Sequence, residues 1–126
     1  METTIKDISN DFGEGFVFSS QMMEVDVNDI GSYIGGEQTD TEKLSYFVNI
    51  SVFKSEKYRK IICISRQIPT FDSSDREYDS WHDLYLLQEK NGIIRAVYCT
   101  GGYCVSRIEG YAEVYKYPEY LKKYFK

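Results

Sequence analysis

The 126-residue chain has a net charge of −5 and an ordinary globular share of hydrophobic residues, 42%. That length supports one domain with its own core, so we treat residues 1–126 as a single domain. The composition argues against intrinsic disorder, and the acidic balance argues against direct nucleic-acid binding. The first residues lack the pattern of an export signal, and no window reaches the ~20 apolar residues of a membrane span. Together with three cysteines, an odd number, this predicts a cytoplasmic protein with reduced thiols.

The first third of the chain predicts only short elements. Residues 3–12 fit a helix with apolar residues on one face, and Gly13 can end it. Residues 14–19 and 21–27 fit short strands. A helix of one to two turns is expected over residues 27–34, before a pair of glycines.

The central part predicts a hairpin. Residues 44–53 alternate with a period of two over ten positions, which is a strong strand signal. Residues 54–57 are a polar turn, and residues 58–66 return as a second strand that Pro69 is expected to end. Residues 70–82 show no clean period and predict a loop.

The last third predicts a four-strand meander followed by a closing helix that starts near Pro118. Asn91-Gly92 lies between two apolar runs and predicts a tight type I′ hairpin turn, which needs two residues at positive φ. Gly101-Gly102 and Glu109-Gly110 predict the other two turns. The expected strands are residues 83–90, 93–100, 103–108 and 111–117.

These elements define the expected fold class. Strands that arrive as sequential hairpins indicate an antiparallel sheet and not a parallel one. We therefore predict an α+β protein with a single antiparallel sheet of about six to seven strands. Its short helices are expected at the two termini and near residues 27–34.

The search for catalytic or metal-binding residues finds three weak patterns. His82, the one histidine, could act as base for a Cys99 or Cys104 nucleophile, although small buried cysteines are more common. A zinc site would need His82 and all three cysteines, including Cys63, without the close pairs typical of zinc ligands. The carboxylates of residues 72–79 lack the spacing of a calcium-binding loop. We therefore expect no metal and no cofactor, and the sequence favours a non-enzymatic protein.

Charge is sorted along the chain. Residues 7–42 contain nine acidic residues and no lysine or arginine. Residues 43–70 have a net charge of +5, residues 71–83 of −4 and residues 84–126 of +3. A cation-free stretch of this length differs from the mixed surface of an ordinary soluble domain.

This sorting predicts a partner. If residues 7–42 lie on one side of the domain, they form an acidic face that repels nucleic acid and attracts basic protein surfaces. The alternative is a solvated acidic periphery without a partner. Tyrosine, a preferred interface residue, is also concentrated late in the chain, with eight of its twelve copies after residue 84. The residues predicted to contact a partner are Glu24, Asp26, Asp29, Tyr33, Glu37, Asp40 and Glu42.

In size, acidity and lack of catalytic residues, the chain resembles two broad groups of proteins. These are phage-encoded anti-defence inhibitors, such as anti-CRISPR proteins, and immunity proteins that neutralise nuclease toxins. The resemblance is one of type, without a shared motif, and implies a partner such as a nuclease or another nucleic-acid-binding effector. One alternative is a small-ligand or nucleotide-binding domain with a pocket lined by tyrosines, Trp81, His82 and the cysteines. Another is a structural protein that assembles into a homo-oligomer.

Overall fold

The fold is taken from a computed structural model, which describes most of the chain. The described residues are 8, 11–19, 37–45, 48–71, 74–102 and 105–125, and for residues 68–71, 77–79, 102 and 105–112 they comprise the backbone only. The predicted strand at 21–27 and the predicted helix at 27–34 lie outside them. No helix in the described part of the chain is long and apolar enough to cross a membrane.

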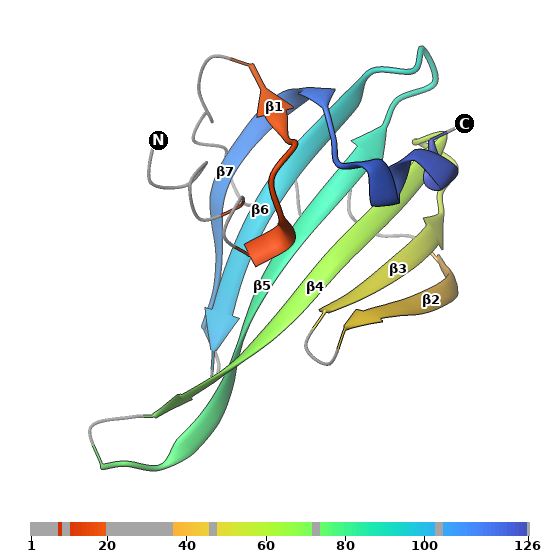
Figure 1. Ribbon diagram of the computed structural model, residues 1–126. Coiled ribbons are helices and arrows are strands. Elements are labelled where there is room, and N and C mark those ends of the chain that lie inside the picture. Colours follow the sequence, from red (N-terminus) through yellow and green to blue (C-terminus); the bar gives the residue numbers. More distant parts are fainter. Residues whose placement is uncertain are drawn as a thin grey trace.

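The described residues form one antiparallel sheet of seven strands in the order β1-β7-β6-β5-β4-β3-β2 (Figure 1). From β2 to β7, each strand pairs with the next one along the chain, and β1 returns to pair with β7. This part of the chain is mostly β, with one short 3₁₀ helix, and is less helical than the predicted α+β class. The elements are β1 (Val17–Phe18), β2 (Glu37–Ser45), β3 (Val48–Lys54), β4 (Lys60–Phe71), β5 (Glu77–Gln88), β6 (Ile94–Gly102), β7 (Val105–Lys116) and η1 (Glu119–Tyr124).

Both faces of the central strands are buried. On β4, Ile62 and Ile64 belong to the larger core cluster, while Ile61 belongs to a second cluster. On β5, Leu86 and Leu87 divide in the same way. Because neighbouring residues of a strand point to opposite faces, the nearly continuous apolar runs of these strands bury side chains on both sides.

The larger cluster lies under two segments from the ends of the chain. Residues 8, 11 and 12 are helical, as predicted, and Gly13 ends this turn at φ +94°. Ile8 and Phe12 are buried against the sheet, and so is Leu121 of η1. Figure 1 shows the N-terminal segment and η1 lying across the same face. The predicted closing helix is therefore present as a 3₁₀ helix packed on the core.

Residues 44–53 contain a chain reversal, so the prediction of one continuous strand is wrong. β2 ends at Ser45, β3 begins at Val48, and the two strands pair antiparallel. A period of two continues unchanged through a short connection, so alternation alone does not reveal the reversal. β2 was not predicted because its sequence is polar and eight of its nine residues are exposed, which leaves no apolar face to mark it.

The strands β4 and β5 are longer than predicted and pair as a hairpin that was not predicted. β4 continues through Pro69 to Phe71, and β5 already begins at Glu77, so most of the predicted loop 70–82 is strand. Pro69 is tolerated because the pairing of β3 with β4 ends at Arg66. Beyond that point one edge of β4 has no described neighbour, and a missing N–H is harmless on such an edge.

The C-terminal meander has three strands, β5 to β7, where the sequence predicts four. Gly101-Gly102 are the last two residues of β6, so the chain reverses just after the predicted turn, whereas Glu109-Gly110 lies inside β7 and two predicted strands are one. Tyr98 faces Gly110 while Cys99 faces Ile108, so Glu109 is an extra residue in the ladder. This is a β-bulge. An isolated glycine in a strand is typical of a bulge as well as of a turn.

The hairpin at Asn91-Gly92 is confirmed, but its turn type differs from the prediction. Gly92 has φ +96°, whereas Asn91 has no positive φ. The Gly92 N–H donates to the Glu89 carbonyl at 2.9 Å, and the Glu89 N–H donates to the Ile93 carbonyl at 2.8 Å. This is a three-residue loop with a glycine in the left-handed region, which is the next commonest hairpin connection after the type I′ and II′ turns.

Candidate functional site

The acidic residues predicted to contact a partner divide into two groups. Glu37, Asp40 and Glu42 lie together on β2, the outermost strand of the sheet. The other four predicted contacts, Glu24, Asp26, Asp29 and Tyr33, lie outside the described residues. The candidate site is therefore β2, which carries three of the nine acidic residues of segment 7–42.

Most of β2 is open to solvent. Every residue of the strand is exposed except Glu42, which is half-buried. In the described part of the chain β2 has a neighbour on one side only, where it pairs with β3. Asp40 accepts a hydrogen bond from the Thr41 N–H at 2.8 Å, and the Thr39 hydroxyl donates to the Val52 carbonyl at 3.2 Å. These local bonds hold the strand while the acidic side chains stay solvated.

Glu42 is engaged within the chain. The Lys123 ammonium lies 2.8 Å from its Oε1 and 2.7 Å from its Oε2. The Tyr124 hydroxyl donates to the same carboxylate. The hydrogen bonds from Lys123 and then Tyr124 lower the pKa of Glu42. Since both partners belong to η1, this carboxylate ties the edge strand to the C-terminal segment and has less capacity for a partner than Glu37 or Asp40.

Two irregularities interrupt the pairing of β2. The register with β3 shifts between Gln38 and Asp40 and again between Lys43 and Ser45. Bulges and charged residues on an edge strand discourage another strand from pairing with it. The free edge is therefore poorly suited to strand addition, and its side chains are the groups that a partner would meet.

A second polar cluster joins the N-terminal segment to the sheet. Asp11 Oδ2 lies 2.5 Å from His82 Nδ1 and accepts a hydrogen bond from the Tyr98 hydroxyl at 3.0 Å. The Tyr98 hydroxyl is also 2.9 Å from His82 Nδ1. Arg66 donates to the Asp11 carbonyl at 3.2 Å, and its guanidinium lies 3.6 Å from Oδ1. With its side chain only 11% exposed, Asp11 fixes this segment on the sheet.

The structure separates His82 from Cys99 and Cys63. His82 bonds to Tyr98, which belongs to the larger core cluster, whereas Cys99 packs against the second cluster on the other face. Cys63 is buried, and burial raises the pKa of its thiol, which disfavours the reactive thiolate. Cys104 lies outside the described residues. Among the described residues no group of three metal-binding side chains occurs.

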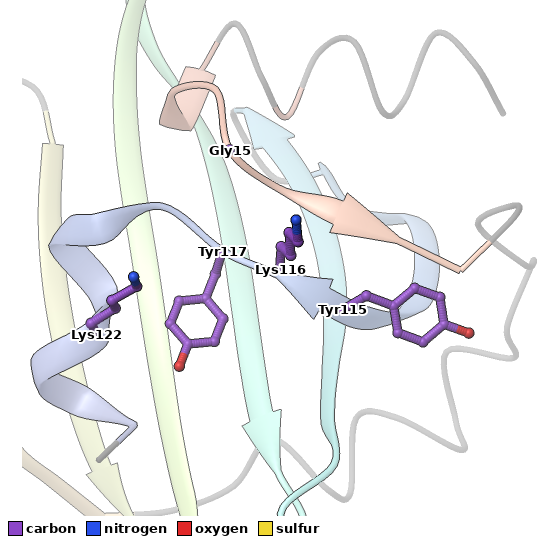
Figure 2. Close-up of a pocket in the computed structure, with 5 residues that line it drawn as sticks. All are labelled: Gly15, Tyr115, Lys116, Tyr117 and Lys122. Carbon is purple, nitrogen blue, oxygen red and sulfur yellow. The ribbon is translucent and has the colours of Figure 1, made fainter.

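The late tyrosines serve mostly as packing residues where they are described. Tyr98 is buried, and Tyr85, Tyr117, Tyr120 and Tyr124 are half-buried. Tyr115 is 60% exposed and lines a pocket at the end of β7 (Figure 2). This pocket contains two tyrosines but neither Trp81, His82 nor a described cysteine, so it differs from the predicted ligand pocket.

Sequence reasoning did not connect Asp11, Arg66, His82 and Tyr98. They come from four segments, and only the pairing of β4 with β5 and of β5 with β6 brings three of them together. No local motif could have indicated this cluster.

Comparisons with protein-family models, with curated proteins and with solved structures found no match.

Proposed function

We propose that this protein is a non-enzymatic binding protein that occupies a basic, nucleic-acid-binding surface of another protein. Anti-defence inhibitors and immunity proteins against nucleases are the types of protein that it resembles, and we place its action in the cytoplasm. The observation that carries the proposal is the position of Glu37 and Asp40, which are both exposed on β2, an edge strand of the described sheet.

The carboxylates of β2 do not destabilise the free protein. Because they are exposed, they remain hydrated until a partner binds, and folding carries no desolvation penalty for them. A cationic surface would then gain long-range attraction, which raises the association rate most at low salt. Lys43 is the one cation on β2 against three acidic residues, which leaves the strand with a net negative charge.

The same charge pattern argues against self-association through this edge. Two copies of β2 that pair antiparallel about Thr41 would place Asp40 of one copy opposite Glu42 of the other, and like charges directly opposite are destabilising. The two register shifts oppose a continuous ladder as well. The geometry therefore supports a different, basic protein as the partner.

The β4–β5 hairpin supplies a second acidic element. The pairing of β3 with β4 ends at Arg66, and the pairing of β5 with β6 ends at Ser80. Residues 69–71 and 77–79 therefore form a two-stranded extension, which projects beyond the rest of the sheet in Figure 1. Residues 74–79, at the end of this extension, have a net charge of −2. An isolated two-stranded ribbon gains little stability from its own pairing, so a role in contacting a partner would explain its length.

A panel of purified nucleases and nucleic-acid-binding effectors tests the proposal. Each is assayed for nucleic-acid cleavage or binding with and without this protein, at about 50 mM and about 300 mM salt. Inhibition of at least one member, weaker at the higher salt, is the expected result. The variant E37Q/D40N should then weaken inhibition by about tenfold, the loss of one to two favourable charge contacts.

The matched control is E14Q/E56Q, which removes the same charge from exposed positions outside β2. Inhibition by this control should stay within about twofold of the natural protein. Equal losses for both variants would show that only total charge matters. Inhibition that is insensitive both to salt and to E37Q/D40N would refute the role of β2.

A further inference from the structure

A pocket of about 380 Å³ lies where β7 ends and η1 begins. Its lining residues are Gly15, Tyr115, Lys116, Tyr117 and Lys122. We call it the β7–η1 pocket. Figure 2 shows Lys116 on the end of β7, Lys122 on η1, and Tyr117 between them. The volume falls within the range of small-ligand sites, which is roughly 300–1,000 Å³.

The walls of this pocket are held by the core. Leu121, next to Lys122, is fully buried, and the Tyr117 ring packs on Phe125 with ring centroids 5.2 Å apart. Gly15 has φ +113°, and a Cβ there would lie 3.3 Å from the Pro118 Cα. The glycine thus lets the N-terminal segment pass directly over the start of the C-terminal segment. Tyr115, Lys116 and Lys122 are exposed, so the fixed parts of the pocket are the Gly15 and Tyr117 walls. Fixed parts of a site lose less conformational entropy on binding than mobile ones do.

The charge of the pocket is opposite to that of the whole protein. Lys116 and Lys122 come from different elements and contribute two ammonium groups. Lys116 has no carboxylate partner among the described residues. Lys122 pairs with Glu119 at 2.6 Å, but both side chains are well exposed, at 60% and 83%. An exposed pair of this type is weak, so an incoming anion can compete for the ammonium.

Tyr117 adds a different kind of contact. Its ring lies between the two lysines, whereas the Tyr115 ring points away from them (Figure 2). Aromatic rings pack well against other planar rings. A long nucleic acid is a poor candidate ligand, because the protein has a net charge of −5 and carries acidic elements elsewhere on its surface. The combination fits a small molecule with one planar ring and one anionic group.

We propose that the β7–η1 pocket binds a small aromatic anion, in which a phosphate or carboxylate contacts Lys116 and Lys122 and the ring lies against Tyr117. This function is separate from the partner binding proposed for β2. The pocket lies beside β7 and β1, although its Lys122 belongs to η1, which Lys123 and Tyr124 join to β2. The two sites share no residue, so a variant of one removes no side chain of the other, and either proposal can fail alone.

Titration followed by ¹H–¹⁵N NMR tests this site with four probes. Adenosine monophosphate and benzoate each have a ring and a charge, adenosine has the ring alone, and inorganic phosphate has the charge alone. The first two should cause saturable shifts of the amide signals of Gly15, Tyr117 and Lys122. Adenosine should bind at least about tenfold more weakly than its monophosphate, because one charge-assisted hydrogen bond accounts for roughly that factor. Inorganic phosphate should be weaker by a similar factor, because it lacks the ring contact.

The variant K116A/K122A should weaken binding of adenosine monophosphate by about tenfold or more. Its matched control is K57A/K90A, which removes two exposed lysines from turns elsewhere and should leave binding unchanged. Y117A should weaken both ring-bearing anions but not inorganic phosphate. Thermal unfolding confirms that each variant is folded. The proposal is overturned if no probe gives saturable shifts, if inorganic phosphate binds as tightly as the monophosphate, or if both lysine variants behave alike.

Discussion

His82 on β5 and Asp11 in the N-terminal segment are joined by a 2.5 Å contact between Nδ1 and Oδ2. The two residues are 71 positions apart in the chain. Tyr98 donates to the same carboxylate oxygen, and Arg66 contacts both the carboxylate and the carbonyl of Asp11. One aspartate therefore links the N-terminal segment to three neighbouring strands of the sheet. Phe12, the next residue, is buried in the core.

Replacing Asp11 with alanine should lower the free energy of unfolding by about 1–3 kcal/mol, the usual cost of leaving partly buried polar partners unpaired. Urea denaturation near neutral pH measures the change. Glu14→Ala is the control, because Glu14 is also acidic and lies in the same segment but is exposed. That control should change stability by less than about 0.5 kcal/mol. Equal effects of the two changes would show that Asp11 does not fix the segment.

A second attachment connects the two end segments to each other. The Tyr120 hydroxyl donates to the Phe12 carbonyl at 2.5 Å, and burial raises the pKa of Tyr120 to about 12. Tyr120→Phe removes this donor and should cost about 1–2 kcal/mol of stability, because the carbonyl loses a partner. Tyr115→Phe makes the same chemical change at a 60% exposed position and should be nearly neutral. Urea denaturation of both variants compares them, and equal stabilities would contradict the role of this hydrogen bond.

The fold was predictable where burial marked the sequence. The central parts of β4, β5 and β6 are apolar, and the hairpin at Asn91-Gly92 has the expected residues. Prediction failed where a strand was polar, or where a glycine was compatible with either a turn or a bulge. β2 is a strand because it pairs with β3, and nothing in its exposed polar residues shows this. Glu109-Gly110 is a bulge and not a turn because the ladder to β6 continues on both sides of it.

The candidate sites were predictable to a smaller degree. Charge sorting pointed to Glu37 and Asp40, and the structure shows that both lie on the edge strand. The same sorting could not show that Glu42 is held by Lys123, a residue 81 positions later. Nor could it show the β7–η1 pocket, whose residues come from three segments that meet only in the folded chain. The periodicity and spacing of residues in a sequence do not show which distant segments meet in the folded chain.

Glu42 should make stability depend on pH in the acidic range. Hydrogen bonds from Lys123 and Tyr124 lower its pKa in the folded protein below the ordinary value of 4.5. Its contribution to stability is therefore complete above the unfolded pKa and is lost as the pH falls through the folded pKa. Glu42→Gln should be less stable than the natural protein near neutral pH, and the two should converge as the pH falls below 4.5. Urea denaturation across this range measures the difference, and a constant difference would contradict the assignment.

Asp83 should show the opposite behaviour. Burial raises its pKa, and the hydrogen bond that it accepts from the Ser65 hydroxyl at 2.6 Å offsets only part of that effect. The unfolded chain releases this proton first, so the group costs stability as the pH rises above its ordinary value of 3.8. Asp83→Asn keeps an acceptor for Ser65 without the buried charge.

We therefore expect Asp83→Asn to be more stable than the natural protein at about pH 7, with the difference shrinking toward about pH 3, where both side chains are neutral. Asp75→Asn is the control, because Asp75 is exposed and its change should alter stability little at either pH. Urea denaturation at both pH values gives the comparison. Destabilisation of Asp83→Asn at neutral pH would mean that the charged carboxylate is stabilised in the folded sheet, and that burial is not the dominant effect on Asp83.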